Sequence, residues 1–337
     1  MALKAPLALT LGDPAGVGPE IIVKAWQALR TSDAPFVVIG DFQSLAAASP
    51  AGASILTRVG SAGEATSVFA DALPVLDMPL SAPVVSGRAS SAHATMIVRW
   101  IETGAGLALS GAVSGLVTAP IAKAPLYEAG FGFPGHTEFL AELTAEAPLE
   151  GARGPVMMLA AGDLRTALVT IHEPYAEVPA LLTRDRIVQT ALVTAQALKR
   201  DFGIAAPRLA VAGLNPHAGE SGAIGRQEIE IIAPAVQALR ALGIDAVGPK
   251  PSDTLFHPEA RALYDAAICM YHDQALIPVK MLDFWGGVNL TLGLPIVRTS
   301  PDHGVGYDVA GRGLARAESL IAAIRMAAEI AGRRQAA

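Results

Sequence analysis

Short runs of apolar residues alternate along this chain with longer segments in which apolar positions recur at helical spacing. A run that is apolar throughout is typical of a strand buried on both faces of a parallel sheet. Strands that alternate with helices indicate an α/β fold. The predicted strands are 7–11, 36–40, 112–118, 154–160, 166–171, 209–214 and 267–271, and the predicted helices are 19–29, 94–109, 184–201, 228–242 and 316–331.

The chain is expected to form two lobes, because 337 residues exceed the size at which a single core usually stops growing. Glycines and a proline near residue 130 precede loops of a different character, and we place a boundary there. The last helix has an apolar face that must pack on the first lobe, which makes that lobe discontinuous. We expect a first lobe of 1–130 with 287–337, a second lobe of 131–286, and a surface connection over the Pro/Ser/Gly-rich stretch 73–87.

Composition excludes several classes of protein. The net charge is -6 and no long basic run occurs, so nucleic acid is not an expected partner. The one cysteine, Cys269, lies in an apolar run and cannot form an internal disulfide, which fits the cytoplasm. Apolar stretches stay well short of the roughly 18 residues that a membrane helix needs, so no membrane contact is expected.

Three histidines follow predicted buried strands, namely His172, His217 and His272. Residues beyond the carboxyl ends of parallel strands project into the place where such sheets bind ligands. Three imidazoles there suit one divalent metal with a position left open for substrate. The alternative is that each is a hydrogen-bonded loop residue. Asp273 or Asp253 could orient a ligating imidazole through a hydrogen bond.

A basic and polar series crosses a largely apolar region, with Lys280, Asn289 and Arg298 at nine-residue intervals. Isolated cations in such surroundings are costly unless an anion pairs with them. A carboxylate or phosphate of a substrate would supply that anion, and Arg298 could bind it through two hydrogen bonds. The alternative is a salt bridge to Asp283 or Asp302.

A second anion site is suggested at the start of a helix over 139–143. Thr137 is the expected N-cap, and backbone N–H groups of the first turn would favour an anionic ligand. An ordinary capped helix is the alternative. No G-x-G-x-x-G follows a strand and no G-x-x-x-x-G-K-[ST] occurs, which disfavours a Rossmann dehydrogenase or a P-loop kinase. A glycine-rich loop over 302–313 remains as a site for a cofactor.

Taken together, these segments resemble the 4-hydroxythreonine-4-phosphate dehydrogenase family of vitamin B6 biosynthesis. The resemblance spans nearly the whole chain and rests on GDPAGVGPEI at 12–21, GHTEFLA at 135–141, IH at 171–172, LNPHAGESG at 214–222, PSDTLF at 251–256, YHDQALIPVK at 271–280 and VNLTLGLPIVRTSPDHG at 288–304. It implies the two-lobed isocitrate/isopropylmalate dehydrogenase-like α/β fold, with a cleft between the lobes and no Rossmann fingerprint.

The resemblance also assigns roles to residues. It implies one divalent metal (zinc, magnesium or cobalt), NAD or NADP as cofactor, and a homodimer with a shared active site. Lys280 or an aspartate beside the metal, Asp273 or Asp253, would transfer protons. The implied metal ligands are His172, His217 and His272, the substrate contacts are His136, Thr137, Lys280, Asn289 and Arg298, and the cofactor contacts are His303, Gly304, Asp308 and Gly311.

The implied reaction is NAD-dependent oxidation and decarboxylation of 4-phosphooxy-L-threonine to 3-amino-2-oxopropyl phosphate. Related dehydrogenases act on other phosphorylated hydroxy acids or on a cyclic diol dicarboxylate, and these stay open as substrates. A three-His metal hydrolase or lyase is the alternative of another class. One departure is visible: Val305 and Gly306 stand where the family has Thr and Ala, and Tyr307 follows.

Overall fold

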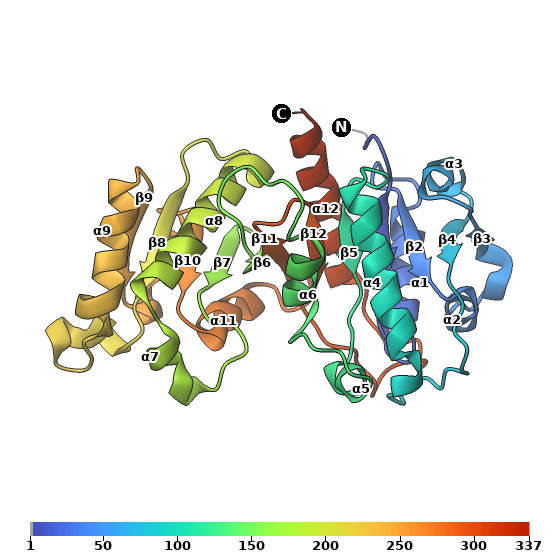
Figure 1. The fold of residues 1–337 in the computed structure, drawn as a ribbon, viewed down its shortest axis with the longest axis horizontal. Helices are drawn as coiled ribbons and strands as arrows, with labels where there is room; N and C mark the ends of the chain where they lie inside the picture. Colours follow the sequence, from blue (N-terminus) through green and yellow to red (C-terminus); the bar gives the residue numbers. More distant parts are fainter. Residues whose placement is uncertain (1–2, 337) are drawn as a thin grey trace. The chain divides into compact units, whose positions relative to one another are not determined.

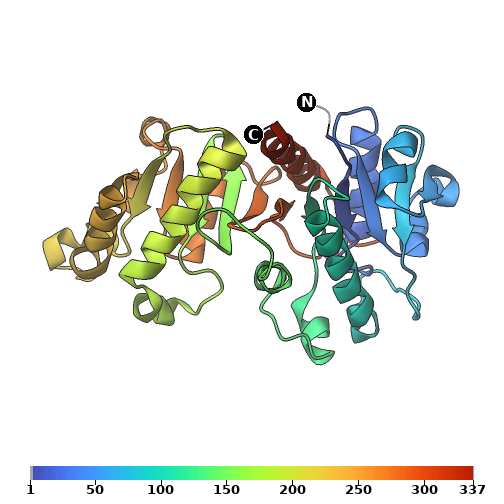
Figure 2. The same ribbon diagram turned by 45° about the horizontal axis from the view of Figure 1, so that its top comes forward.

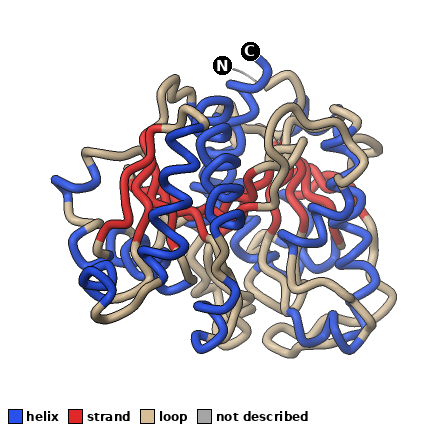
Figure 3. Tube along the Cα trace, turned by 60° about the vertical axis from the view of Figure 1, so that its left-hand side comes forward, coloured by secondary structure: helices blue, strands red, loops and turns tan. Residues whose placement is uncertain are grey.

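The computed structural model describes residues 3–336 and divides into two compact units. Unit 1 comprises the chain up to Pro148 and from Pro295 onward, and unit 2 is Leu149–Leu294. Each unit combines helices with a β-sheet (Figures 1 and 3). Both boundaries lie later in the chain than predicted. Residues 131–148 belong to unit 1 because α6 (His136–Leu143) packs against α4 (Ala94–Leu109), and β11 (Val288–Leu292) belongs to unit 2 because it pairs with β6 (Val156–Ala161).

The strands of unit 1 are all parallel, in the order β3-β4-β2-β1-β5-β12. The central strands β1 and β2 are buried at every position, and Thr10 is the one polar residue in their sequences. Helices cover both faces: α1 packs with α12, and α4 lies across β1, β2 and β5 (Figure 2). The strands are β1 (Leu7–Thr10), β2 (Phe36–Gly40), β3 (Leu56–Arg58), β4 (Leu73–Asp77), β5 (Leu116–Thr118) and β12 (Arg298–Pro301), and the remaining helices are α1 (Gly18–Leu29), α2 (Phe42–Ala48), α3 (Ala65–Val68), α5 (Lys123–Glu128) and α12 (Glu318–Ala336).

The predicted surface connection over 73–87 is wrong at its beginning. Residues 73–77 form β4, which lies between β2 and β3, and Leu73 and Val75 are fully buried. The prolines, serines and glycine after Asp77 give the whole stretch the composition of a loop and conceal the short apolar run before them. Composition averaged over a window therefore misses a strand of this length.

The strands of unit 2 follow the order β11-β6-β7-β10-β8-β9. β6 runs antiparallel to both β11 and β7, whereas β7, β10, β8 and β9 are parallel to one another. Helix α11 contributes the buried Ala275 and Val279 to a core that it shares with β6, β7, β8 and β10. The other strands are β7 (Leu164–Leu168), β8 (Arg208–Ala212), β9 (Asp245–Lys250) and β10 (Ala266–Cys269), and the helices are α7 (Val178–Leu181), α8 (Arg184–Phe202), α9 (Ala233–Ala241), α10 (Pro258–Arg261) and α11 (His272–Leu282).

Helix ends in unit 2 follow local chemistry where caps are present. The Thr183 side chain accepts a hydrogen bond from the Arg186 N–H at the start of α8, and Gly203 ends it in the left-handed region. The single helix predicted over 228–242 instead begins with a π-helical turn, η6 (Glu228–Ile232), and continues as α9. Within residues 3–336, no helix is both long and apolar enough to cross a membrane.

Candidate functional site

The three predicted metal ligands follow three neighbouring parallel strands of unit 2. His172 lies in the loop after β7, His217 lies in the loop after β8, and His272 begins α11 just after β10. Because β10 pairs with β7 on one side and β8 on the other, all three chain segments leave the sheet at the same edge. The sheet topology thus agrees with the placement that the sequence predicts.

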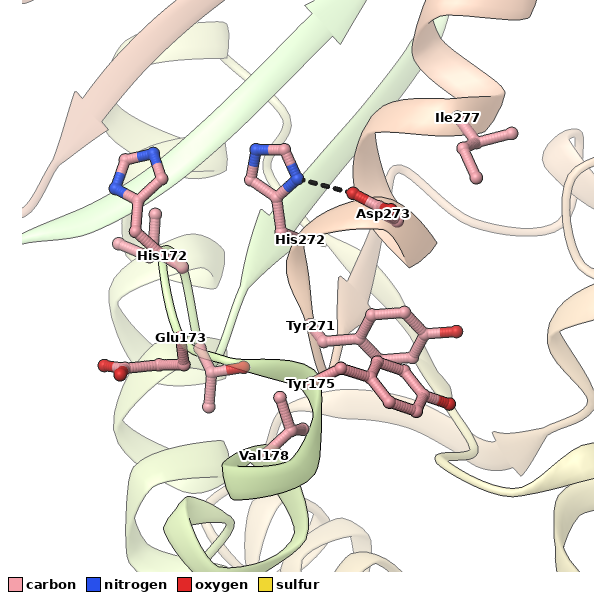
Figure 4. Close-up of a pocket in the computed structure, with 10 residues that line it drawn as sticks. His172, Glu173, Tyr175, Val178, Tyr271, His272, Asp273 and Ile277 are labelled. Carbon is pink, nitrogen blue, oxygen red and sulfur yellow. Dashed lines mark hydrogen bonds and ion pairs between the residues drawn. The ribbon is translucent and has the colours of Figure 1, made fainter.

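Two of these imidazoles lie close together. The ring centroids of His172 and His272 are 5.7 Å apart, and both side chains line a cavity of about 500 Å³ (Figure 4). Among the described residues of a single chain, no group of three or more His, Cys, Asp or Glu side chains is arranged to hold a metal ion. The structure therefore brings together His172 and His272, and it does not bring His217 into the same group.

Asp273 is the predicted carboxylate that contacts an imidazole. Its Oδ1 lies 2.7 Å from Nδ1 of His272, as the dashed line in Figure 4 marks. A hydrogen bond of this kind fixes the tautomer, so that Nε2 of His272 presents its lone pair to a ligand. Asp253 lies in the 3-10 turn η7 (Ser252–Thr254), is exposed, and forms no ion pair with an imidazole within the described part of the chain.

Two tyrosines form another wall of this cavity. The rings of Tyr175 and Tyr271 pack edge to face with centroids 5.4 Å apart (Figure 4). Burial, together with the neighbouring Tyr175 and Asp273, raises the pKa of Tyr271. The phenol of Tyr271 consequently stays protonated at neutral pH, where it can donate a hydrogen bond but does not act as a base.

A buried cation is the main feature of the candidate site in unit 1. Arg298 on β12 is only 4% exposed, and its Nη2 donates a hydrogen bond of 2.7 Å to Oγ1 of Thr118 at the end of β5. Burial lowers the pKa of Arg298 to about 10, against the opposing effect of Glu138. The guanidinium is still charged at neutral pH, and a ligand anion would offset the cost of burying that charge.

His136 lies within the field of this cation. Burial, Arg298 and Lys123 lower the pKa of His136 well below its ordinary value, so its imidazole is neutral at neutral pH. Its Nε2 is buried and has no hydrogen-bond partner among residues 3–336. A neutral, buried imidazole with an unsatisfied nitrogen beside a cation is suited to hydrogen-bond an anionic ligand.

The predicted N-cap of the following helix is wrong. α6 begins at His136, its N-cap is Gly135 in an extended conformation, and Thr137 lies inside the first turn. A glycine cap offers no side-chain oxygen, so no side chain satisfies the N–H groups of this turn. The helix start therefore agrees better with an anion site than a threonine cap would.

The remaining predicted substrate residues lie in unit 2. Lys280 is part of α11, and its Nζ lies 5.1 Å from the centre of the Phe284 ring. Asn289 lies on β11, and its Oδ1 is buried without a hydrogen-bond partner among the described residues. An unsatisfied amide oxygen on a strand that is otherwise buried is consistent with a role in binding a ligand.

The predicted cofactor loop connects β12 to α12 and packs on the loop that follows β1. The Tyr307 hydroxyl donates to Oδ2 of Asp13 at 2.6 Å, and the Val17 N–H donates to the Val305 carbonyl at 2.8 Å. At its other end, the loop is held by Glu20, whose Oε1 accepts from the Ala315 N–H at 2.9 Å. The Tyr307 hydroxyl and the main-chain groups of Val305 and Ala315 thus anchor the loop.

The four predicted cofactor residues lie along this loop. Asp308 and Gly304 are exposed, while His303 is half-buried with Nδ1 2.9 Å from the Gly304 carbonyl. Gly311 has φ +72°, and a Cβ there would come within 2.8 Å of the Ser86 side chain. Only glycine fits this position without displacing its neighbour.

Several residues in these sites were missed by the sequence analysis. Lys123 and Thr118 adjoin the site in unit 1, and their sequence contexts resemble those of ordinary surface and strand residues. Gln274 is buried, donates from Nε2 to the Gly213 carbonyl and to Ser252 Oγ, and accepts from the Met270 N–H. These hydrogen bonds connect the segments that follow β8, β9 and β10. Nothing in the sequence around Gln274 indicates partners in the segments after β8 and β9.

Both units combine helices with largely parallel strands that end in polar loops, which confirms the predicted α/β class, and the solved structures of similar fold described below are those of dehydrogenases. Residues 32–327 match the family described as pyridoxal phosphate biosynthetic protein PdxA. The chain belongs to this family, and the resemblance carried by its motifs is confirmed.

Individual relatives cover almost the whole chain. A 4-hydroxythreonine-4-phosphate dehydrogenase of Caulobacter vibrioides is 72% identical over 330 residues, which are 98% of each chain. The crystal structure of an enzyme of the same name from Klebsiella pneumoniae has a TM-score of 0.85 and 40% identity, covering 98% of this chain and 99% of that one. A terephthalate 1,2-cis-dihydrodiol dehydrogenase from Burkholderia xenovorans has a TM-score of 0.63 and 31% identity, covering 96% and 98%.

The environment of His136 predicts a loss of stability in acid. The unfolded chain takes up a proton on this residue below about pH 6.5, whereas the native state does not, so the free energy of unfolding falls as the pH drops through that value. His136→Asn should reduce this loss, measured by urea unfolding at neutral and acidic pH. The control His257→Asn removes an exposed imidazole and should keep the loss near pH 6.5, because the Glu259 carboxyl, whose pKa this imidazole lowers, titrates in a more acidic range. An unchanged pH dependence in His136→Asn would contradict the prediction.

Proposed function

We propose that this protein catalyses the NAD-dependent oxidation and decarboxylation of 4-phosphooxy-L-threonine. Its relatives carry the name 4-hydroxythreonine-4-phosphate dehydrogenase, which supports the oxidation of this substrate. The product would be 3-amino-2-oxopropyl phosphate, for pyridoxal phosphate biosynthesis in the cytoplasm. The buried guanidinium of Arg298, close to the neutral imidazole of His136, supports an anionic substrate, because a cation in surroundings of low dielectric attracts an anion strongly. Family membership supports the reaction.

We propose that His172, His217 and His272 hold one divalent ion, which is zinc, magnesium or cobalt. The imidazole donor set fits such an ion, since two of the rings already face one cavity and Asp273 orients one of them. When bound, the ion supplies Lewis acidity that lowers the pKa of a hydroxyl group and polarises a carbonyl group.

The chain's own residues would bind and orient the substrate. Arg298, His136 and the first-turn N–H groups of α6 suit one of its anionic groups, and Lys280 and Asn289 stay predicted contacts from the sequence. Loss of the C3 hydroxyl proton to a base and of hydride from C3 to NAD would leave a β-keto acid, which readily loses carbon dioxide, and a proton then replaces the lost carboxyl group. Lys280, Asp273 and Asp253 stay the candidates for proton transfer.

The loop between β12 and α12 is proposed to bind the adenosine of NAD or NADP through His303, Gly304, Asp308 and Gly311. Anchoring at Tyr307 and at Ala315 supports this role, because a loop that is already ordered loses less entropy on binding.

An exposed apolar patch on unit 2 supports a homodimer with a shared active site. Ile277, Met281, Phe284 and Trp285 are 60%, 82%, 58% and 48% exposed, and they gather on α11 and the turn that follows it. Patches of this kind mark interaction surfaces. We propose that this apolar patch packs against a second copy of the chain, where a ligand from the other subunit would complete each metal site.

The phosphate of the substrate is predicted to be essential. Charge-assisted hydrogen bonds contribute roughly 1.5 to 3 kcal/mol each, so unphosphorylated 4-hydroxythreonine should show a kcat/KM at least about 100-fold lower. Arg298→Ala should lower kcat/KM by a comparable factor with the phosphorylated substrate. It should lower kcat/KM little further with the unphosphorylated one, because the mutation and the missing phosphate remove the same interaction. Production of NADH, followed by its absorbance, measures the rates. The exposed Arg325→Ala is the control.

Comparable kcat/KM for both substrates would contradict the assignment and favour a cyclic diol dicarboxylate, in keeping with the name of the Burkholderia relative. No NADH from either substrate class, with the metal bound, would favour a three-His hydrolase or lyase instead.

The metal site is predicted to need all three histidines. His172→Ala, His217→Ala and His272→Ala should each lose most of the bound divalent metal and the activity while keeping the fold, since these residues are not in the core. Mass spectrometry measures the metal stoichiometry, and circular dichroism shows whether the fold is kept. His257→Ala, an exposed histidine elsewhere in unit 2, should keep the metal. Wild-type stoichiometry in all three variants would place the site elsewhere.

The apolar patch predicts the oligomeric state. Met281→Asp should shift the dimer toward monomer in light scattering, because it puts a charge at the centre of the proposed interface, whereas Leu263→Asp, on another exposed surface, should not. Mixing inactive His217→Ala and His172→Ala subunits should restore some activity if these ligands come from different chains. A monomeric wild-type protein at micromolar concentration would exclude the dimer.

A further inference from the structure

The loop after β8 contains an unusual run of left-handed backbone. Four residues other than glycine have positive φ angles, with 51° at His217, 49° at Ala218, 43° at Glu220 and 56° at Ser221, and Gly219 between them has 81°. This conformation costs roughly 1–2 kcal/mol for each such residue, and it persists only where the surroundings fix it. The contacts that hold this loop therefore bear on the direction of the His217 side chain.

Glu228 provides those contacts at the base of the loop. Its carboxylate is buried, with Glu228 only 3% exposed. Oε1 accepts hydrogen bonds of 2.7 Å from the backbone N–H groups of Leu214 and Asn215, and Oε2 accepts one of 2.9 Å from Nδ2 of Asn215. Three donors converge on one charged group, and hydrogen bonds to a charged acceptor are stronger than those between neutral groups.

The loop is also wrapped closely around this carboxylate. A Cβ built on Gly219, in the middle of the left-handed run, would come within 2.6 Å of Glu228 Oε2 and 2.7 Å of the Gly225 carbonyl. Glu228 thus contacts the loop at two places, at Leu214 and Asn215 before His217 and at Gly219 after it. It also begins the π-helical turn η6, and such turns occur frequently at functional sites.

We propose that Glu228 is a positioning residue for His217: its carboxylate fixes the left-handed turn and so directs the imidazole toward the metal. The inference rests on the proposed metal site and adds a residue that does not touch the ion. Glu228 acts through the backbone of Leu214 and Asn215 and through its packing against Gly219. Replacement of residues that orient metal ligands typically lowers metal affinity about 10- to 100-fold.

The test is the variant Glu228→Gln, which keeps the size of the side chain. Its amide nitrogen must face either the N–H groups of Leu214 and Asn215 or the Asn215 amide, so a donor meets a donor. Affinity for Zn²⁺, measured by competition with a chromophoric chelator, should fall at least about 10-fold. Hydrogen exchange in the metal-free protein should become faster over 214–222. The control Glu230→Gln removes an exposed partner of Arg226 in the same helical turn and should change neither.

The outcomes separate this inference from the metal site itself. Wild-type Zn²⁺ affinity in His217→Ala overturns the proposed ligand set and this inference with it. Lost affinity in His217→Ala with wild-type affinity in Glu228→Gln overturns only the role of Glu228. If Glu228→Gln does not fold, Asn215→Ala removes one donor and leaves the carboxylate in place, and it should weaken Zn²⁺ binding in the same direction. Unchanged affinity in that variant also overturns the proposal.

Discussion

The parallel pairing of β7, β10 and β8 is the constraint on which the chemistry of unit 2 depends. Ala267 on the middle strand is in register with Thr166 on one side and Ala210 on the other, so the three strands run together toward one edge. Each strand then leads into a loop or helix start that carries an imidazole. A slip of one residue in the pairing of a strand would turn every side chain of that strand to the opposite face and move its loop relative to the others.

In unit 1 the corresponding constraint is a charge placed in an apolar sheet. Arg298 lies on β12 beside Thr118 on β5, where burial makes its charged form less favourable without neutralising it. Burial of His136 itself, together with the charges of Arg298 and Lys123, lowers the pKa of His136 and keeps its imidazole neutral. A buried cation beside a neutral imidazole whose Nε2 has no partner among the described residues supports the binding of an anionic ligand.

Two buried polar side chains, Glu228 and Gln274, hold loops of unit 2 in place through hydrogen bonds. Glu228 fixes the left-handed run that carries His217, and Gln274 joins Met270, Gly213 and Ser252 at the bases of the loops after β10, β8 and β9. Both side chains are buried and hydrogen-bonded, so their hydrogen bonds offset the cost of removing their polar groups from water. Local strain is thereby confined to residues next to the proposed chemistry.

The sequence by itself determined the α/β class, most strands and the ends of helices such as α8, because apolar runs and caps act over a few neighbouring residues. It also determined the family through its motifs. It did not predict β4, the glycine cap of α6 or the π-helical turn at Glu228. Only the tertiary structure decided the partners of Arg298 and Gln274, since those contacts join residues far apart in the chain that strand order, which no local pattern encodes, brings together. It also decided the partners of Glu228, because the segment after β8 folds back on itself over more residues than a local pattern spans.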